Sequence, residues 1–260
     1  QDAIDDASAG DKIRIWAGNY TENIDVYKRL SVIGNYTNDQ HLTTINGSWQ
    51  GNVVNVSAEY VVLEKLRVIH SKNHTNGVNY IGISVTEDWC EIRNVLVEYN
   101  GDGISFSGSE KHTIDDSKIM NNSIGLYIRD SSQYVTVGNT TIKGNDNYGV
   151  VGVYAHYSEF YYNDITNNGG HGIIHERGIN NLYVGNNISD NGDHGIYISA
   201  SGEQGPGRNN FFKDNIINDN ENSGINFVDE ANNNTFIGNE LKDNDYGIRF
   251  MASPDNLFIN

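Results

Sequence analysis

The feature that most constrains this chain is a glycine that returns at nearly even steps. It is the middle residue of a tripeptide that starts with any residue and ends with Ile, Val or Leu. This glycine occurs at Gly82, Gly103, Gly125, Gly149, Gly172, Gly195, Gly224 and Gly247. The steps between them are 21, 22, 24, 23, 23, 29 and 23 residues. This period is too short for a repeating pair of helices and is typical of one coil of a β-solenoid.

Apolar residues alternate after this glycine in every coil. The next position holds Ile, Leu or Val, from Ile104 to Ile248, and the position two further on holds mainly Phe and Ile, from Phe106 to Phe250. Such alternation indicates a half-buried strand. The one long step contains "GEQGPG", which we interpret as an inserted loop.

Two further columns complete the predicted coil. An asparagine precedes the glycine from Asn100 to Asn244, and stacked amides at a turn predict a hydrogen-bonded ladder. A second apolar strand is predicted with inward residues at Cys90 and Ile92, Val135 and Val137, and Leu182 and Val184. Cys90, the single cysteine, is therefore expected in the core as a small hydrophobe.

These columns predict an all-β fold, a right-handed parallel β-helix with coils of about 23 residues. We expect one domain over residues 1–260, with an N-terminal helical cap and irregular first coils over 1–80 and regular coils over 81–260. The chain begins at Gln1 and ends within a coil, so we expect it to be a fragment of a longer protein.

The charge balance excludes several classes of partner. The formal net charge is −17, which argues against nucleic acid and anionic membrane surfaces. No apolar run approaches the ~18 residues of a membrane span, so no membrane insertion is expected. Acidic turns at 144–147 and 190–193 offer hard oxygen ligands for Ca²⁺, but no cofactor is required by any motif.

The middle coils concentrate the groups that carry chemistry. Column alignment gathers Arg129, Asp130, Tyr148, Tyr154, His156, His171, Glu176, Arg177, Asp193 and His194. Tyr148, His171 and His194 should stack in one ladder, and Glu176 should face outward between Val153 and Ser199. Tyr127 and Tyr197, two residues after their glycines, are expected outside the coil, where rings can stack on sugars. His175 lies in the Phe and Ile column beside Gly152, so we interpret it as a core residue.

Two reaction types are compatible with this set. Proton abstraction from a sugar needs a base, an acid and a cation, for which we expect His194 or His156, Tyr148 or Tyr154, and Arg177. Hydrolysis needs two carboxylates about 5–9.5 Å apart, and Glu176 with Asp193 is the best such pair. Two histidines with Asp193 match no specific metal motif, so no metal site is assigned.

The chain resembles known repeat families. Asp11 to Ile33 is similar to the opening of the NosD-type and carbohydrate-binding sugar-hydrolase repeat family, and "NNTFIGNELKDNDYGIRF" to archaeal cell-surface members of it. The middle coils resemble alginate C5-epimerases and lyases through "YGV" at Tyr148, "HGIIHE" at Glu176 and "HGI" at His194. Where that family has Asp-Pro-His, this chain has Tyr154 and Ala155 before His156.

We therefore expect an extracellular or cell-surface protein that binds and modifies a polysaccharide by hydrolysis, elimination or C5-epimerisation, as the resemblance to epimerases and to methanogen disaggregatases implies. The alternative is a non-catalytic building block of an archaeal surface layer, sheath or filament. In that case the coils would stack end to end into a homo-oligomer, because an uncapped coil end is a sheet edge.

Overall fold

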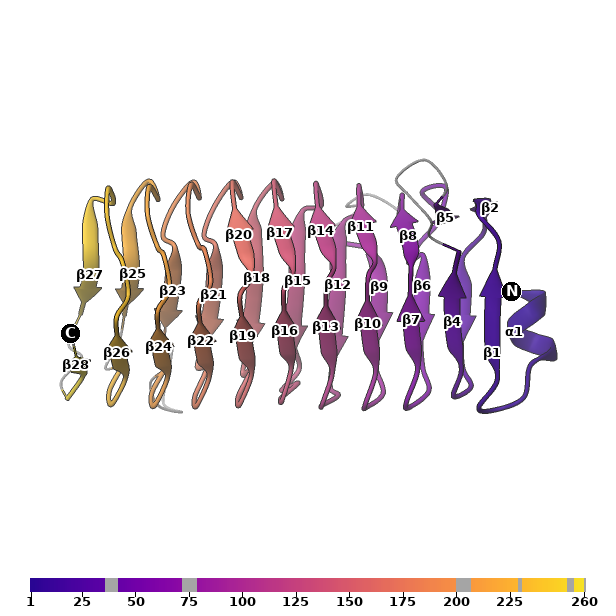
Figure 1. Ribbon diagram of the computed structural model, residues 1–260, viewed down its shortest axis with the longest axis horizontal. Coiled ribbons are helices and arrows are strands. Elements are labelled where there is room, and N and C mark those ends of the chain that lie inside the picture. The colour runs from indigo at the N-terminus through magenta and orange to yellow at the C-terminus, as the bar shows by residue number, and fades with distance from the viewer. Residues whose placement is uncertain (36–41, 72–78, 200–206, 229–230, 252–254, 260) are drawn as a thin grey trace.

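The chain folds as a parallel β-solenoid that begins with one short helix (Figure 1). Its coils stack on one another, and their strands form three parallel sheets along the sides of the solenoid. The computed structural model describes residues 1–35, 42–71, 79–199, 207–228, 231–251 and 255–259. The strands of the described residues pair in parallel, and each strand pairs with its counterparts in the neighbouring coils. The sequence-based fold class is therefore confirmed, although the predicted loop at 202–207 lies almost wholly outside the described residues.

Sheet A is the longest of the three and runs along the whole solenoid. Its strands are β1 (Lys12–Ile15), β4 (Ser31–Gly34), β7 (Val62–Glu64), β10 (Glu91–Arg93), β13 (Thr113–Asp115), β16 (Thr136–Gly138), β19 (Glu159–Tyr161), β22 (Leu182–Val184), β24 (Phe211–Lys213), β26 (Thr235–Ile237) and β28 (Leu257–Ile259).

Sheet B follows sheet A in each of the earlier coils. Its strands are β2 (Gly18–Thr21), β5 (Thr43–Asn46), β8 (Leu66–Ile69), β11 (Leu96–Glu98), β14 (Lys118–Met120), β17 (Thr141–Lys143) and β20 (Asp164–Thr166). Single bridges continue it through Asn187, Ile216 and Glu240.

Sheet C contains the glycine repeat that dominates the sequence. Its strands are β3 (Ile24–Val26), β6 (Val54–Val56), β9 (Ile81–Val85), β12 (Asp102–Ser107), β15 (Ile124–Arg129), β18 (Tyr148–Val153), β21 (Ile173–Glu176), β23 (Ile196–Ser199), β25 (Ser223–Phe227) and β27 (Tyr246–Phe250).

The core is the stack of inward columns that the alternation predicts. Leu126 pairs with Ile104 and Val150, and Ile128 with Phe106 and Gly152, and these apolar side chains are fully buried. The helix α1 (Asp2–Asp6) closes the N-terminal end and buries Ile4 against the core. Lys28 Nζ donates to the carbonyls of Ile4, Asp5 and Ala7 at 3.1, 2.7 and 2.9 Å, which caps the last turn of this helix.

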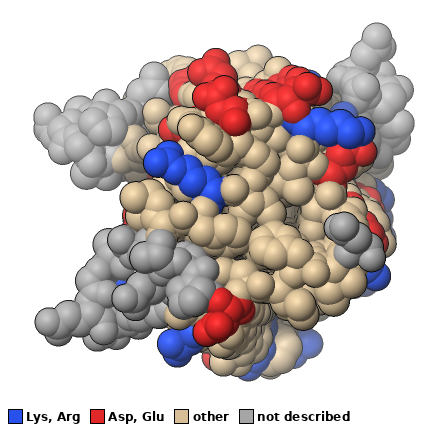
Figure 2. Space-filling model, turned by 90° about the vertical axis from the view of Figure 1, so that its left-hand side faces the viewer, with Lys and Arg blue, Asp and Glu red and all other residues tan. Residues whose placement is uncertain are grey.

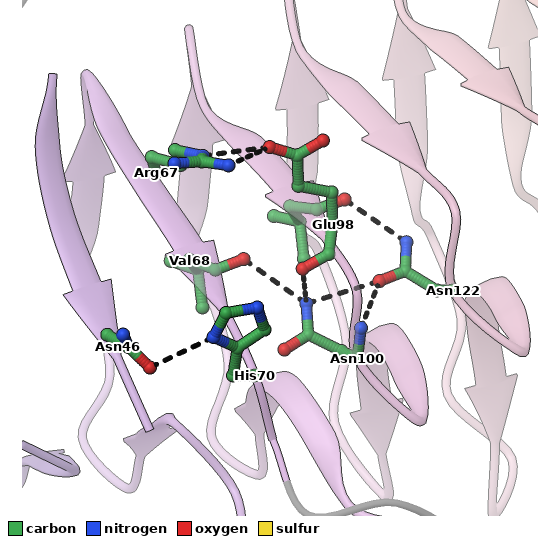
Figure 3. Close-up of polar contacts among 8 residues, drawn as sticks. Asn46, Arg67, Val68, His70, Glu98, Asn100 and Asn122 are labelled. Carbon is green, nitrogen blue, oxygen red and sulfur yellow. Dashed lines mark hydrogen bonds and ion pairs between the residues drawn. The ribbon is translucent and has the colours of Figure 1, made fainter. Parts of the chain in front are cut away.

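The asparagine column before the glycine forms the expected ladder. Asn100 Nδ2 donates to the carbonyls of Val68 and Glu98 and to Asn122 Oδ1, at 3.2, 2.9 and 3.1 Å (Figure 3). The Asn100 backbone N–H donates to the same Oδ1 at 3.0 Å. The pattern repeats in each later coil as far as Asn244. The asparagine amides therefore supply hydrogen-bond partners to the backbone N–H and C=O groups at the turn between sheets B and C.

Two further asparagine ladders occupy the other corners of the coil, and the column analysis did not predict them. One runs between sheets A and B through Asn163, Asn186, Asn215 and Asn239. The other runs between sheets C and A through Asn181, Asn210, Asn234 and Asn256. Both recur at the coil period, so the signal for them is present in the sequence. In earlier coils Thr140 and Ser117 fill the position between sheets A and B, and Ser158 fills that between sheets C and A.

The inward column of sheet A confirms part of the prediction and corrects part of it. Ile92 and Val137 are buried, as is Cys90, whose pKa burial raises to about 11. The prediction for Leu182 and Val184 is wrong, because Tyr183 between them points inward. Its ring stacks between Phe160 and Phe212 with centroids 5.4 and 4.7 Å away, which fixes the strand one residue out of the predicted phase. No helix among the described residues is long and apolar enough to cross a membrane.

Candidate functional site

The groups expected to carry chemistry lie mostly on the outer surface of sheet C, over β15, β18, β21 and β23. Three outward columns form this surface, which we call the sheet C face. The columns are Ile124, Tyr148, His171 and His194 beside the asparagine ladder, Tyr127, Val151, Ile174 and Tyr197 along the middle, and Arg129, Val153, Glu176 and Ser199 at the far edge.

The middle column provides an apolar floor between two aromatic side chains. Tyr127, Val151, Ile174 and Tyr197 are register partners in four successive coils, a span of about 14 Å. Val151 and Ile174 are only 8% and 9% exposed although they face outward. Burial raises the pKa of the Tyr127 phenol, so this group stays protonated and able to donate a hydrogen bond.

One edge of this floor is the predicted aromatic ladder. The ring centroids of Tyr148 and His171 lie 5.6 Å apart and those of His171 and His194 lie 5.1 Å apart, with nearly parallel planes. The Tyr197 ring lies 4.9 Å from His171 and 5.7 Å from His194. The stack therefore joins the edge to the floor and holds these rings in fixed positions.

Hydrogen bonds from the next coil determine which ring nitrogen carries the proton. The His171 Nδ1 atom accepts the His194 backbone N–H at 3.1 Å, and the His194 Nδ1 atom accepts that of Ser223 at 3.0 Å. A neutral imidazole has one lone pair, so Nε2 must carry the proton in both rings. Burial lowers both pKa values, that of His171 to about 4, and the rings are neutral donors at pH 7.

This arrangement revises the role expected for His194. Its Nε2 atom lies 2.9 Å from Asn226 Nδ2, and Asn226 Oδ1 has no partner among the described residues. With the amide in the opposite orientation, Oδ1 accepts the Nε2 proton and both groups are satisfied. His194 therefore has no free lone pair with which to act as a base. Asn226 and Ser223, which hold this ring, were not singled out by the sequence pattern, although they occupy its columns.

Asp193 brings a third group to the two histidines without completing a metal site. Its carboxylate lies 3.6 Å from His171 Nδ1 and 3.7 Å from His194 Nε2, and it accepts a hydrogen bond from Asn222 Nδ2 at 3.1 Å. The three ligand atoms are close enough for one ion. Both imidazole lone pairs are already used by backbone N–H groups, however, so only Asp193 has electrons to offer a cation.

The opposite edge carries Arg129 and Glu176. Glu176 is exposed and pairs with Val153 and Ser199, as expected. The Arg129 guanidinium lies over the Tyr127 ring at 5.4 Å, and its Nε lies 3.8 Å from Asp130, which accepts from Ser107 Oγ at 2.5 Å.

Three expected residues lie just past this edge, in the turn that follows each strand of sheet C. Asp130, Tyr154 and Arg177 have φ values of 54°, 54° and 58°, which places them in the left-handed turn region. The Arg177 guanidinium lies over the Tyr154 ring at 4.8 Å. This pair therefore borders the sheet C face rather than lying on it.

Two expected pairings are not brought together. Glu176 and Asp193 lie at opposite ends of neighbouring strands, about 16 Å apart along the strand direction, which is too far for paired acid–base hydrolysis. His156 lies beyond the turn towards sheet A, half-buried, with Nδ1 accepting the Ile179 backbone N–H at 3.3 Å. Burial lowers its pKa, and it does not join the sheet C face.

His175 is a core residue, as expected from its column. It is fully buried, its Nδ1 is hydrogen-bonded to the Tyr183 hydroxyl, and burial lowers its pKa to about 3. A Cβ on Gly152 would lie 2.2 Å from His175 Cδ2, so the glycine makes room for the ring. The acidic turns considered for Ca²⁺ place Asp146 and Asp190 at exposed positions.

The family is decided by a comparison with family models. The model described as the right handed beta helix region matches residues 76–241 and 180–260, well over half of the chain. The chain belongs to the right-handed β-helix family. For this β-helix protein the predicted fold and handedness are thereby confirmed, whereas the closer resemblance to NosD-type and archaeal surface proteins stays a prediction. No curated protein matches the sequence.

Several solved structures share the fold of this β-helix protein. The Dettilon tailspike protein is 15% identical with a TM-score of 0.71, over 91% of this chain and 49% of the other, so the chain spans about half the tailspike's length. The A-module of Azotobacter vinelandii mannuronan C-5 epimerase AlgE4 is 13% identical with a TM-score of 0.71, over 100% and 93%. The catalytic unit of an α-1,3-glucanase from Streptomyces thermodiastaticus is 16% identical with a TM-score of 0.67, over 91% and 51%. At these identities the likeness concerns the fold.

Proposed function

We propose that this protein binds a polysaccharide along the sheet C face and modifies it. The observation that carries the proposal is the middle column, where Val151 and Ile174 form a nearly buried apolar floor between Tyr127 and Tyr197. Sugar rings have one apolar face and polar edges, and such ligands favour flat apolar surfaces bordered by fixed polar groups. The neutral N–H of His171 and the charged groups of Glu176 and Arg129 border this floor.

Proton abstraction beside a carboxylate fits this surface better than hydrolysis. Glu176 and Asp193 are too far apart for hydrolysis, whereas elimination or C5-epimerisation needs one base, one acid and a cation. Glu176 would accept the proton, Arg129 would neutralise the sugar carboxylate, and the Tyr197 hydroxyl would supply a proton to the substrate. Tyr148 lies nearly as far along the strand from Glu176 as Asp193 does, which is too far for it to act on the same sugar. The likeness to a mannuronan C-5 epimerase and to an alginate lyase from Paenibacillus supports this class. We further propose that the protein acts outside the cell or at its surface, where such polymers occur.

Product analysis tests the reaction. Wild-type protein is incubated with uronate-containing and neutral polysaccharides, and the products are analysed by mass spectrometry and by absorbance of unsaturated ends. Glu176→Gln should abolish product formation, while Glu159→Gln, on the outer face of sheet A, should leave it unchanged. If no substrate gives a product with the folded wild type, or if Glu176→Gln is fully active, the catalytic part of the proposal fails.

Binding is tested separately by isothermal titration calorimetry. Ile174→Glu puts a charge on the floor of the sheet C face and should abolish binding, whereas Thr136→Glu on the outside of sheet A should not. Wild-type affinity in Ile174→Glu would remove the sheet C face as the binding surface.

The second candidate function is assembly through the last coil, and one observation favours it. Leu257, Phe258 and Ile259 are 53%, 52% and 44% exposed on β28, and charged side chains lie around the rim of this end of the solenoid rather than in its middle (Figure 2). Exposed apolar edge strands pair readily with other strands. If the wild type forms concentration-dependent oligomers in sedimentation and Phe258→Asp is monomeric, assembly is supported; a monomeric wild type excludes it.

A further inference from the structure

A second surface, remote from the sheet C face, gathers aromatic rings and cations. It lies on the first coils, at the turn that leads from sheet C into sheet A. The residue two positions before each sheet A strand forms a column there, which we call the turn column. Its members are Gly10, Arg29, Tyr60, Trp89, Lys111, Tyr134, Tyr157, Asn180, Asn209, Asn233 and Asp255.

The backbone at the turn column does not favour large side chains. From Tyr60 onward every member has a φ between 54° and 64°, a region suited to Gly, Asn and Asp. The later coils use Asn180, Asn209, Asn233 and Asp255, whereas the earlier coils place aromatic rings there. Tyr60 and Trp89 are 46% and 44% exposed, so packing in the core does not account for them. The same backbone conformation recurs with exposed rings at other turns of the solenoid, for example at Tyr99 and Tyr162, so conformation and exposure alone do not mark the turn column as a binding site.

The rings of the turn column hold two cations in place. The Tyr60 and Trp89 centroids lie 5.9 Å apart with nearly parallel planes. The Arg29 guanidinium lies over the free face of Tyr60 at 5.3 Å, and the Lys111 ammonium over that of Trp89 at 4.5 Å. No carboxylate in the described part of the chain lies within ion-pair distance of Arg29, which leaves its N–H groups available to an anion.

A cavity of about 330 Å³ adjoins these side chains. The residues that line it include Lys12, Arg29, Tyr60, Val62, Trp89 and Glu91. Arg93 Nη1 binds Glu91 at 3.0 Å, and Arg93 Nη2 binds Glu64 at 3.2 Å. Glu64 also pairs with Lys65 at 3.2 Å, so Arg93 and Lys65 together balance the two carboxylates and leave the charges of Lys12 and Arg29. Within a protein of net charge −17, this local excess of cations marks a place that attracts negative groups.

We propose that this cavity is a second saccharide-binding site, specific for a sugar that carries a carboxylate. The carboxylate binds between Arg29 and Lys12, and the pyranose ring lies on Val62 and the edges of Tyr60 and Trp89. Because the cation–π contact already fixes the guanidinium, little side-chain freedom is lost when the anion binds. The site does not depend on the function proposed for sheet C, since it shares no residue with that face.

Isothermal titration calorimetry with hexagalacturonate tests the site, with neutral maltohexaose and a hexaglutamate of equal charge for comparison. Arg29→Gln should weaken hexagalacturonate binding about tenfold, the loss expected for one charge-assisted hydrogen bond. Trp89→Asn should weaken it similarly without loss of folding, because asparagine fills the same column in later coils. Lys143→Gln on sheet B, an exposed cation, is the matched control.

The outcomes separate this site from the sheet C face. The proposal is supported if hexagalacturonate binding is weakened in Arg29→Gln and Trp89→Asn but has the wild-type affinity in Lys143→Gln. Ile174→Glu should still bind hexagalacturonate at this cavity. Loss in Ile174→Glu alone assigns all binding to sheet C and overturns it. Equal binding of hexaglutamate overturns the saccharide assignment. No binding of hexagalacturonate also overturns the proposal, and leaves sheet C open to neutral sugars.

Discussion

Burial keeps several imidazoles of this chain neutral, with pKa values lowered to about 4 for His112, about 4 for His171 and about 3 for His175. In each of His112, His156, His171 and His194 the Nδ1 atom accepts a backbone N–H of a neighbouring coil. These histidines thus serve as acceptors in the same way as the ladder asparagines. This is why the base role expected for His194 and His156 does not follow from their place in the sequence.

The first prediction concerns the effect of pH on stability. An unfolded histidine ionises near pH 6.5, whereas these folded ones stay neutral to about pH 4, so the unfolded chain binds more protons below pH 6.5. The free energy of unfolding should therefore fall as pH drops from 6.5 towards 4, by up to about 1.4 kcal/mol per pH unit for each histidine.

The variant His175→Gln isolates one of these contributions, since glutamine does not titrate and can still bind the Tyr183 hydroxyl. Urea unfolding between pH 7 and 4 should give a shallower pH dependence for the variant than for the wild type. Carboxylates titrate in both proteins and cancel in the difference. Parallel curves would show that His175 is already accessible to protons in the native state.

The second prediction concerns the space beside His175. Gly152→Ala would put a methyl group 2.2 Å from His175 Cδ2 in a fully packed core, and should lower the free energy of unfolding by about 1–3 kcal/mol. The double variant Gly152→Ala and His175→Ala should lose less free energy of unfolding than the two single variants combined. The added methyl group fills part of the space that the imidazole leaves. Additive losses in urea unfolding would contradict the contact.

At the scale of the strands and turns, the columns of sheet C could be predicted because one glycine sets their phase. The register of β22 could not, because Gly138 and Gly185 lie one position out of register, Gly138 being aligned with Val184. Both Leu182 and Tyr183 suit an inward position. The stacking of Tyr183 on Phe160 and Phe212 decides it. In the candidate site, the stack of Tyr148, His171 and His194 could be predicted from the repeat spacing. The ring nitrogen that carries the proton in each imidazole could not, because it depends on backbone N–H groups one coil away.

The third prediction concerns the ladder of sheet C. Asn168 is 2% exposed, donates to Ile142 O and Asn191 Oδ1, and accepts the backbone and side-chain N–H of Asn145. Asn168→Ala leaves several of these groups buried without partners and should cost about 2–4 kcal/mol. Asn244→Ala, at the last rung and half-buried, should cost clearly less. Equal losses in chemical denaturation would mean that position in the ladder has no influence.

At the scale of the whole molecule, each coil contacts mainly its two neighbours, and the two ends differ. Helix α1 covers the N-terminal end, whereas β27 and β28 leave Tyr246, Leu257 and Phe258 exposed at the other (Figure 1). In such a quasi-one-dimensional structure, opening starts where neighbours are missing.

The fourth prediction is a gradient of hydrogen exchange. Backbone amides of β27 and β28 should exchange fastest, and protection should rise towards β12 and β15. Mass spectrometry of peptic peptides after deuterium labelling measures this gradient. Phe258→Asp should speed exchange in β26 and β28 and leave β12 unchanged. Uniform protection across the coils would indicate that the solenoid opens only as a single cooperative unit.

The three asparagine ladders also have an evolutionary consequence. Each asparagine donates to the one in the next coil in the same way. The strand register repeats as well: Thr136 pairs with Glu159 just as Thr113 pairs with Thr136. Removing residues 136–158 would bring Glu159 directly beside Thr113 and rejoin every column. Duplication or deletion of one coil in the gene thus changes the length of the molecule without remaking its core. The length of the protein can therefore change in steps of one whole coil.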